Sequence, residues 1–261
     1  MKIYYRKEID GLRALAVIPV VFYHAGFEIF SGGFIGVDVF FVISGYLITN
    51  IIYDELIKKK FTLKNFYERR ARRILPALFT VIIFSSILAF LIMTKSEINS
   101  YFRSIIATLF FFSNFHFWKN APYFSSEVDL QPLIHAWSLS IEEQFYIVFP
   151  LFLIISFKFF KRLLLPLILI FLSISLFFCI LLSFKTGGNL NFYFTLSRGW
   201  ELLTGALISI LSFKGYLKNS NKILSELFSI LGLFLIFIPI FFLNKQSTFP
   251  GLSTLFPVIG T

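Results

Sequence analysis

The chain has 261 residues, of which 57% are hydrophobic, 20% are aromatic and only 15% are charged, and its mean hydropathy is +0.81. Soluble domains carry about 25% charged residues. A soluble chain of this length would expose more surface than so few charges can cover, so a water-soluble globular protein is excluded. The apolar residues come in runs of about 20, the length that crosses a bilayer as a helix. The composition therefore predicts a protein embedded in a lipid bilayer.

The net charge of +10 does not indicate a nucleic acid partner. The basic residues gather at the ends of the apolar runs, as the positive-inside rule describes. They do not alternate with aromatic residues in a stripe that could stack bases. The single cysteine, Cys179, lies inside an apolar run and is interpreted as a small buried side chain. We expect neither nucleic acid nor a bound metal ion.

Eight apolar segments are long enough to cross the bilayer, and a ninth begins near Leu252. They far exceed the ~10 residues of a barrel strand, and backbone hydrogen bonds in lipid must close within the segment, so helices are predicted. The expected fold class is all-α: a polytopic transmembrane helix bundle that forms one membrane domain over residues 1–261. Because the ninth segment is cut at Thr261, further helices are expected beyond it. The eight segments are 12–30, 33–53, 74–94, 101–118, 141–159, 163–184, 196–213 and 224–244.

The basic residues also predict how the chain is oriented. A loop at 58–73 holds eight of them and the first loop holds none, so the N-terminus and the 58–73 loop are expected in the cytoplasm. Segment 101–118 leaves two arrangements open. If this segment spans the membrane, six later basic residues lie on the outer side. If it is re-entrant or lies along the surface, those six lie on the cytoplasmic side and four others lie outside. The positive-inside rule favours this second arrangement. The six are Lys158, Lys161, Arg162, Lys214, Lys218 and Lys222, and the four are Lys119, Lys185, Arg198 and Lys245.

Arg13 and His24 share the first predicted helix. Their separation of eleven residues is three turns plus 20°, so both lie on one face, about 16.5 Å apart along the axis. Ionisable residues inside a membrane are functional by default, which makes His24 a candidate general base. The alternative is that His24 only hydrogen-bonds a neighbouring helix.

Asp38 is the first acidic residue of the second predicted helix. Helical rise places it about 8 Å below the outer turn and His24 about 12 Å below, close enough to meet. A carboxylate in the bilayer costs a few kcal/mol unless it is paired, and His24 and Arg198 are its plausible partners. Beside His24 it would fix the tautomer and favour a general base. The alternative is a shallow, hydrated Asp38.

Four arginines follow Glu68 closely: Arg69, Arg70, Arg72 and Arg73. On a helix they form two i,i+3 pairs on adjacent faces. Paired guanidinium groups suit bidentate capture of phosphates, so these residues are candidates for binding a phosphorylated donor. The alternative is that they only set topology or attract anionic lipid.

Two further clusters contain candidate residues. Glu142 and Glu143 open an apolar helix and point about 100° apart, so at least one should face the bundle; the alternative for Glu142 is a favourable interaction with the helix dipole. An i,i+3 pair joins Arg198 and Glu201. The residues interpreted as substrate-binding or structural are His135, Trp137, Ser138, Arg198, Trp200 and Glu201.

Taken together, these motifs resemble those of acyltransferase family 3, a family of integral membrane O-acyltransferases. They occur in the order of the family and extend over the whole chain. The matching pieces are 8–16, the spacing of Arg13 and His24, 36–48, 69–77, 135–146, 198–201, 250–252 and 257–260.

The resemblance implies a multi-pass enzyme of the bacterial inner (cytoplasmic) membrane that uses acyl-CoA, commonly acetyl-CoA. It implies an acceptor hydroxyl on lipopolysaccharide, peptidoglycan, exopolysaccharide or a small glycosylated molecule. It also implies that a soluble extracytoplasmic domain can follow Thr261.

The resulting hypothesis is that the four arginines hold the phosphates of the donor in the cytoplasm. The thioester arm then follows the face of Arg13 and His24. His24 deprotonates the acceptor or carries the acyl group, oriented by Asp38 or Glu143. A proton-coupled transporter remains an alternative, because relays use the same residue types, and so does a non-catalytic scaffold. No inverted repeat is evident, which favours the enzyme.

Overall fold

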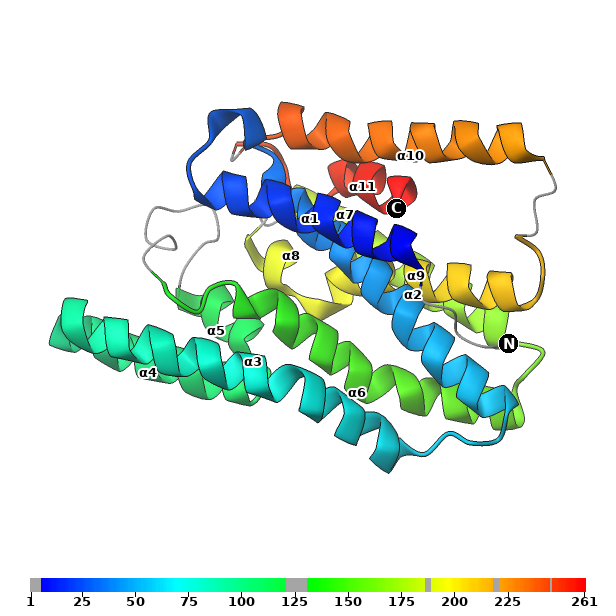
Figure 1. Cartoon of the computed structure of the whole chain (residues 1–261), viewed down its shortest axis with the longest axis horizontal. Coiled ribbons are helices and arrows are strands. Elements are labelled where there is room, and N and C mark those ends of the chain that lie inside the picture. Colours follow the sequence, from blue (N-terminus) through cyan, green and yellow to red (C-terminus); the bar gives the residue numbers. More distant parts are fainter. Residues whose placement is uncertain (1–5, 121–130, 186–188, 218–220, 245) are drawn as a thin grey trace.

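The computed structural model describes residues 6–120, 131–185, 189–217, 221–244 and 246–261. Regular structure in these ranges is helical, without strands, and the long helices run side by side along the longest axis (Figure 1). Three short 3-10 turns are Glu28–Phe30, Gly33–Ile35 and Leu252–Thr254. The α-helices are α1 (Lys7–His24), α2 (Gly36–Ile57), α3 (Leu63–Ile92), α4 (Lys95–Leu109), α5 (Ser113–Asn120), α6 (Ala136–Phe159), α7 (Leu164–Lys185), α8 (Asn189–Tyr193), α9 (Thr195–Phe213), α10 (Lys222–Phe242) and α11 (Leu255–Gly260).

Five of the described helices are long and apolar enough to cross a membrane: α2 with its preceding turn, α3, α6, α7 and α10. Large apolar side chains on α3, α7 and α10 point outward, as expected where helices face lipid tails rather than water. Examples are Phe84, Leu91, Phe177 and Phe234. The predicted class, an all-helical membrane bundle, is confirmed, although five helices meet this description where eight complete spans were predicted.

The third helix begins earlier than predicted. Thr62 caps α3, because its side-chain oxygen accepts a hydrogen bond from the backbone N–H of Asn65 at 3.4 Å. From there α3 continues for 30 residues without interruption. The prediction of a basic loop over 58–73 is therefore wrong from Leu63 onward. Arg69 to Arg73 lie on a rigid helix, which fixes the directions of their side chains.

Segment 101–118 is not one helix. α4 ends at Leu109, the backbone turns through Phe111 with a φ of +57°, and α5 begins at Ser113. α4 folds back along α3 (Figure 1), and the two are joined through the Tyr101 hydroxyl, which lies 2.8 Å from the Ser85 hydroxyl. The segment therefore turns back within the bundle.

As a consequence, later helices return to the end of the bundle where α1 begins (Figure 1). The Tyr53 ring near the end of α2 lies 5.8 Å from Phe157 of α6 and 5.1 Å from Phe213 of α9. The basic residues beside these positions therefore gather at one end, the arrangement expected if 101–118 does not span. They are Lys158, Lys161, Arg162, Lys214 and Lys222, while Lys218 and Lys245 lie outside the described residues.

α2 occupies the centre of the bundle and packs most closely against α9. A Cβ atom on Gly45 would lie 1.9 Å from the backbone oxygen of Leu202, and one on Gly205 would lie 2.0 Å from that of Val42. Only glycine permits this approach of two backbones. Because such contact leaves no room for sliding, α2 and α9 form a rigid pair.

Candidate active site

His24 is the last residue of α1. Its Nδ1 atom lies 2.8 Å from the backbone oxygen of Val20, one turn earlier. A carbonyl oxygen can only accept a hydrogen bond, so Nδ1 must carry the proton and the neutral ring keeps a lone pair on Nε2. This tautomer suits a general base.

His135 lies within electrostatic reach of His24, although the two are far apart in the sequence. Burial lowers the pKa of the His135 imidazole below its ordinary value, and the nearby His24 lowers that pKa further. Part of the ring is exposed at the start of α6. The structure therefore places two imidazoles at one end of the bundle, which the spacing of residues in the sequence could not indicate.

Arg13 lies on the same continuous helix as His24, towards the opposite end of α1. Its guanidinium contacts the carboxylate of Asp10 at 3.3 Å and is partly exposed. This contact engages Arg13 near the beginning of α1, about 16.5 Å from His24 along the helix.

Asp38 pairs with Arg198, one of the two partners considered for it. Nη2 of Arg198 lies 2.6 Å from Oδ1 of Asp38, and Nη1 lies 3.1 Å from Oε1 of Glu201. All three side chains have an exposed fraction of 0%. We call them the buried triad.

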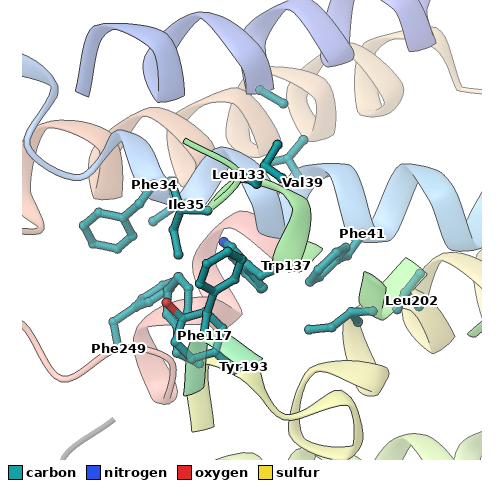
Figure 2. Close-up of a cluster of buried hydrophobic side chains, with 14 of the residues drawn as sticks. Phe34, Ile35, Val39, Phe41, Phe117, Leu133, Trp137, Tyr193, Leu202 and Phe249 are labelled. Carbon is teal, nitrogen blue, oxygen red and sulfur yellow. The ribbon is translucent and has the colours of Figure 1, made fainter. Parts of the chain in front are cut away.

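Four aromatic rings surround the guanidinium of Arg198, with their centroids 5.3–5.9 Å from Cζ. They come from α2, α6, α8 and the segment between α10 and the turn Leu252–Thr254, and Figure 2 shows Phe41, Trp137 and Phe249 among the buried side chains. Aromatic faces attract a cation most strongly where water is absent. The rings are Phe41, Trp137, Phe192 and Phe249. Trp200, the remaining aromatic candidate, is buried among Val42, Cys179 and Val258.

Glu142 is held by two hydroxyl groups. Ser44 of α2 donates to Oε1 at 3.0 Å, and Tyr146 donates to Oε2 at 3.1 Å. The guanidinium of Arg70 on α3 lies 4.9 Å above the Tyr146 ring and within electrostatic reach of Glu142. These contacts, which we call the Glu142 cluster, join three helices. Tyr146 could have been found from its i,i+4 spacing to Glu142, whereas nothing in the sequence links Ser44 or Arg70 to it.

A cavity of about 250 Å³ lies between α2 and α6, next to the Glu142 cluster. Its polar lining comes from Ser138 and Glu142, three and seven residues after His135. Helical rise places them about 4.5 and 10.5 Å from His135 along α6. The lining residues are Val37, Phe40, Ser138, Leu139 and Glu142. Along α6, the cavity therefore begins about one turn after His135 and extends to Glu142.

Glu143 does not reach the end of the bundle that holds His24 and His135. It is buried and faces the side of Arg70 and Tyr67, and it lies about 12 Å from His135 along α6. Asp38 is engaged by Arg198. The prediction that Asp38 or Glu143 orients His24 therefore has no support in the geometry, which gives that role to the Val20 carbonyl.

The four arginines of α3 occupy three different environments. Arg69 contacts both carboxylate oxygens of Glu55, at 2.8 and 3.1 Å. Arg72 contacts Glu68 at 2.7 Å and is 79% exposed. Arg70 points inward to the Glu142 cluster, whereas Arg73 is exposed. Three guanidinium groups therefore remain accessible at the surface.

The described residues define a multi-pass membrane protein with polar clusters inside its helix bundle. Within those residues no group of three or more metal-ligating side chains occurs. The profile of the family described as Acyltransferase domain matches residues 6–261. The chain therefore belongs to this acyltransferase family, as the motifs had indicated.

Several characterised proteins are similar in sequence. O-acetyltransferase OatA of Staphylococcus aureus (strain NCTC 8325 / PS 47) is 39% identical over 265 residues, covering 98% of this chain and 41% of that protein. Peptidoglycan O-acetyltransferase OatA of Listeria monocytogenes is 41% identical over 211 residues, covering 78% of this chain and 34% of that protein. The chain thus spans about two fifths or less of these relatives. An uncharacterized protein of Haemophilus influenzae is 34% identical over 239 residues, which cover 94% of its length. No solved structure matches the chain.

Proposed function

We propose that the chain is the membrane domain of an O-acyltransferase that moves an acetyl group from cytoplasmic acetyl-CoA to a hydroxyl of an extracytoplasmic glycan. The observation that carries the proposal is a row of polar groups from Arg70 through Tyr146 to Glu142. Glu142 and Ser138 line the cavity, and His135 precedes Ser138 by three residues at the start of α6. The name of the Listeria relative makes peptidoglycan the first acceptor to test.

The donor phosphates bind at the beginning of α3. Arg69, Arg72 and Arg73 are exposed, and the first two hold single carboxylates that a phosphate can replace. Exposed ion pairs contribute only about 0–1 kcal/mol, so this exchange costs little. Arg70 has another role, since it stacks on Tyr146 inside the protein.

The thioester arm enters the cavity between α2 and α6. This route replaces the one along Arg13 and His24, because the cavity is lined by Glu142 and by Ser138, which follows His135 by three residues. Apolar walls suit the methylene groups of the arm, and Glu142 can accept a hydrogen bond from an amide N–H.

At the histidine pair, Nε2 of His24 takes the proton of the acceptor hydroxyl. The oxygen attacks the thioester carbonyl carbon, the C–S bond breaks, and the proton passes from His24 to the leaving thiolate. In the covalent variant, Nε2 attacks the thioester carbon and the C–S bond breaks. The acyl group then passes to the acceptor oxygen, and the freed Nε2 takes the hydroxyl proton and gives it to the thiolate. The lowered pKa of His135 keeps that ring neutral, so no second positive charge opposes protonation of His24.

The variant His24→Ala tests this step. Removing a general base should lower acetyl transfer by about 10²–10⁴-fold. The protein should remain in the membrane, because His24 is exposed at a helix end. The assay is transfer of labelled acetyl groups from acetyl-CoA to glycan in membrane vesicles containing the full-length protein. His116→Gln, at a histidine on α5, is the matched control, and normal transfer by His24→Ala would remove His24 from the mechanism.

We also propose that the protein lies in the bacterial cytoplasmic membrane with its N-terminus inside, and that a further extracytoplasmic domain completes the full protein. Cysteines introduced by Lys119→Cys and Lys158→Cys test the orientation, since both positions are exposed. An impermeant thiol reagent added outside whole cells should label only the first. The reverse pattern would invert the topology and place the donor site on the outer face.

A further inference from the structure

The buried triad contains two acids and one base. Arg198 bridges Asp38 and Glu201 with different nitrogens, and none of the three side chains is exposed. If both acids were ionised, the triad would hold an uncompensated negative charge away from water. Such a charge is strongly unfavourable in a protein interior and is avoided by taking up a proton.

The geometry indicates where that proton resides. The carboxyl groups of Asp38 and Glu201 both contact the same guanidinium, which carries a single positive charge. Arg198 approaches Asp38 more closely, at 2.6 Å against 3.1 Å for Glu201. The charged acid should be the one nearer the guanidinium, so the proton belongs on Glu201.

The triad lies directly behind one wall of the cavity. On α2, Val37 and Phe40 line the cavity, while Asp38 and Phe41, one position further along, face Arg198. Neighbouring positions on a helix point about 100° apart. The same turn of α2 therefore carries both the contact with Arg198 and two lining residues of the cavity.

The same relation holds on α6. Trp137 packs against Arg198 at 5.9 Å and against Phe41 at 6.1 Å, whereas the next residues, Ser138 and Leu139, line the cavity. Arg198 thus ties α2 and α6 together at the level of the cavity. His135 lies two residues before Trp137, as the N-cap residue of the same helix.

We propose that Asp38, Arg198 and a protonated Glu201 form a positioning centre that sets the width of the cavity between α2 and α6 and the place of His135. The three residues act through the helices and do not touch substrate. The link to catalysis rests on the proposed acyl transfer, whereas the link to cavity width does not.

The first experiment measures cavity access without any reaction. Ser138→Cys places a thiol in the cavity, and the native Cys179 is buried and serves as background. In detergent-purified protein, the rate of modification by a small maleimide should change severalfold when Asp38→Asn or Arg198→Lys is added. Lysine keeps the charge but cannot bridge two acids. Asp54→Asn, at the other buried carboxylate of α2, is the matched control and should leave the rate unchanged. Equal rates in all four proteins would overturn the positioning role, whether or not the chain transfers acyl groups.

The second experiment concerns the proton. Infrared spectra should contain a band of a buried protonated carboxyl group that is absent in Glu201→Gln. Asp38→Asn should lose it as well, because Glu201 then ionises to neutralise Arg198. The double variant Asp38→Asn/Glu201→Gln should accumulate poorly in the membrane, since Arg198 is left without a negative partner. A band that persists in both single variants would show that the triad holds no proton.

The third measurement separates positioning from simple stability. Asp38→Asn should lower kcat per folded enzyme by about 10²-fold, as small misplacements do, and at least tenfold more than Glu201→Gln. The affinity for coenzyme A should be unchanged, because the phosphates bind on α3. An unaltered kcat in the folded fraction would mean that the triad only stabilises the fold.

Discussion

Two arginine–acid contacts with nearly the same sequence spacing lie in opposite environments in this protein. Arg198 and Glu201 are separated by three residues, and Arg72 and Glu68 by four. The first arginine is 0% exposed and enclosed by aromatic rings, whereas the second is 79% exposed. Breaking a buried pair costs about 3–5 kcal/mol, while an exposed pair contributes about 0–1 kcal/mol. Burial, and not pairing, separates an arginine that holds the architecture from one that can exchange its partner for a ligand.

Replacing each arginine by alanine gives the largest contrast. Arg198→Ala leaves Asp38 buried without its cation and removes the guanidinium from among its four aromatic rings. We therefore expect the free energy of unfolding to fall by about 3–5 kcal/mol, with little protein in the membrane. Arg72→Ala should accumulate normally. Quantitative immunoblots of membrane fractions measure both. Similar accumulation of the two variants would show that the comparison is wrong.

The next largest effect is expected at the exposed arginines, where a phosphate of the donor would replace the carboxylate partner. The double variant Arg69→Lys/Arg72→Lys keeps the charge but removes the planar forks that fit phosphates. Affinity for coenzyme A should fall by about 1.5–3 kcal/mol per lost contact, or roughly tenfold to a hundredfold each. Insertion should be unaffected. Binding to purified protein is the measurement; unchanged affinity would mean that the two arginines only set topology or pair with Glu55 and Glu68.

The Glu142 cluster lies between these extremes, since its carboxylate is partly accessible from the cavity. Tyr146→Phe removes one hydrogen bond to Glu142 but keeps the ring beneath Arg70. The expected loss is about 0.5–1.5 kcal/mol of stability, which thermal unfolding in detergent can detect. The exposed variant Tyr216→Phe is the control. A loss as large as that of Arg198→Ala would place Glu142 with the architectural residues.

The smallest expected effect is the pH response of His135. Because its pKa in the folded protein lies below the ordinary value of 6.5, the unfolded chain binds the proton more readily. The stability contributed by this residue is therefore complete above pH 6.5 and decreases as the pH falls towards the lower, folded value. His135→Gln should flatten that part of the profile of thermal stability against pH. An unaltered slope would show that His135 is as well solvated in the folded protein as in the unfolded chain.

Much of the protein could be predicted from local properties of the sequence. Hydropathy indicated helices in a membrane, helical periodicity placed Arg13 and His24 on one continuous helix, and the order of short motifs identified the family. Each of these depends on neighbouring residues or on composition, which tertiary packing does not change.

The partners of the polar side chains were decided by the tertiary structure alone. Asp38 had two candidate partners, and only the packing of α2 on α9, through Gly45 and Gly205, brings it to Arg198. His135 comes near His24 only because the chain turns back at Phe111 before α6 begins. The arginines of α3 differ because one face of that helix is covered and another is not. A buried charge needs a partner, but which helix supplies it depends on contacts between segments far apart in the sequence, and periodicity within one helix carries no information about those contacts.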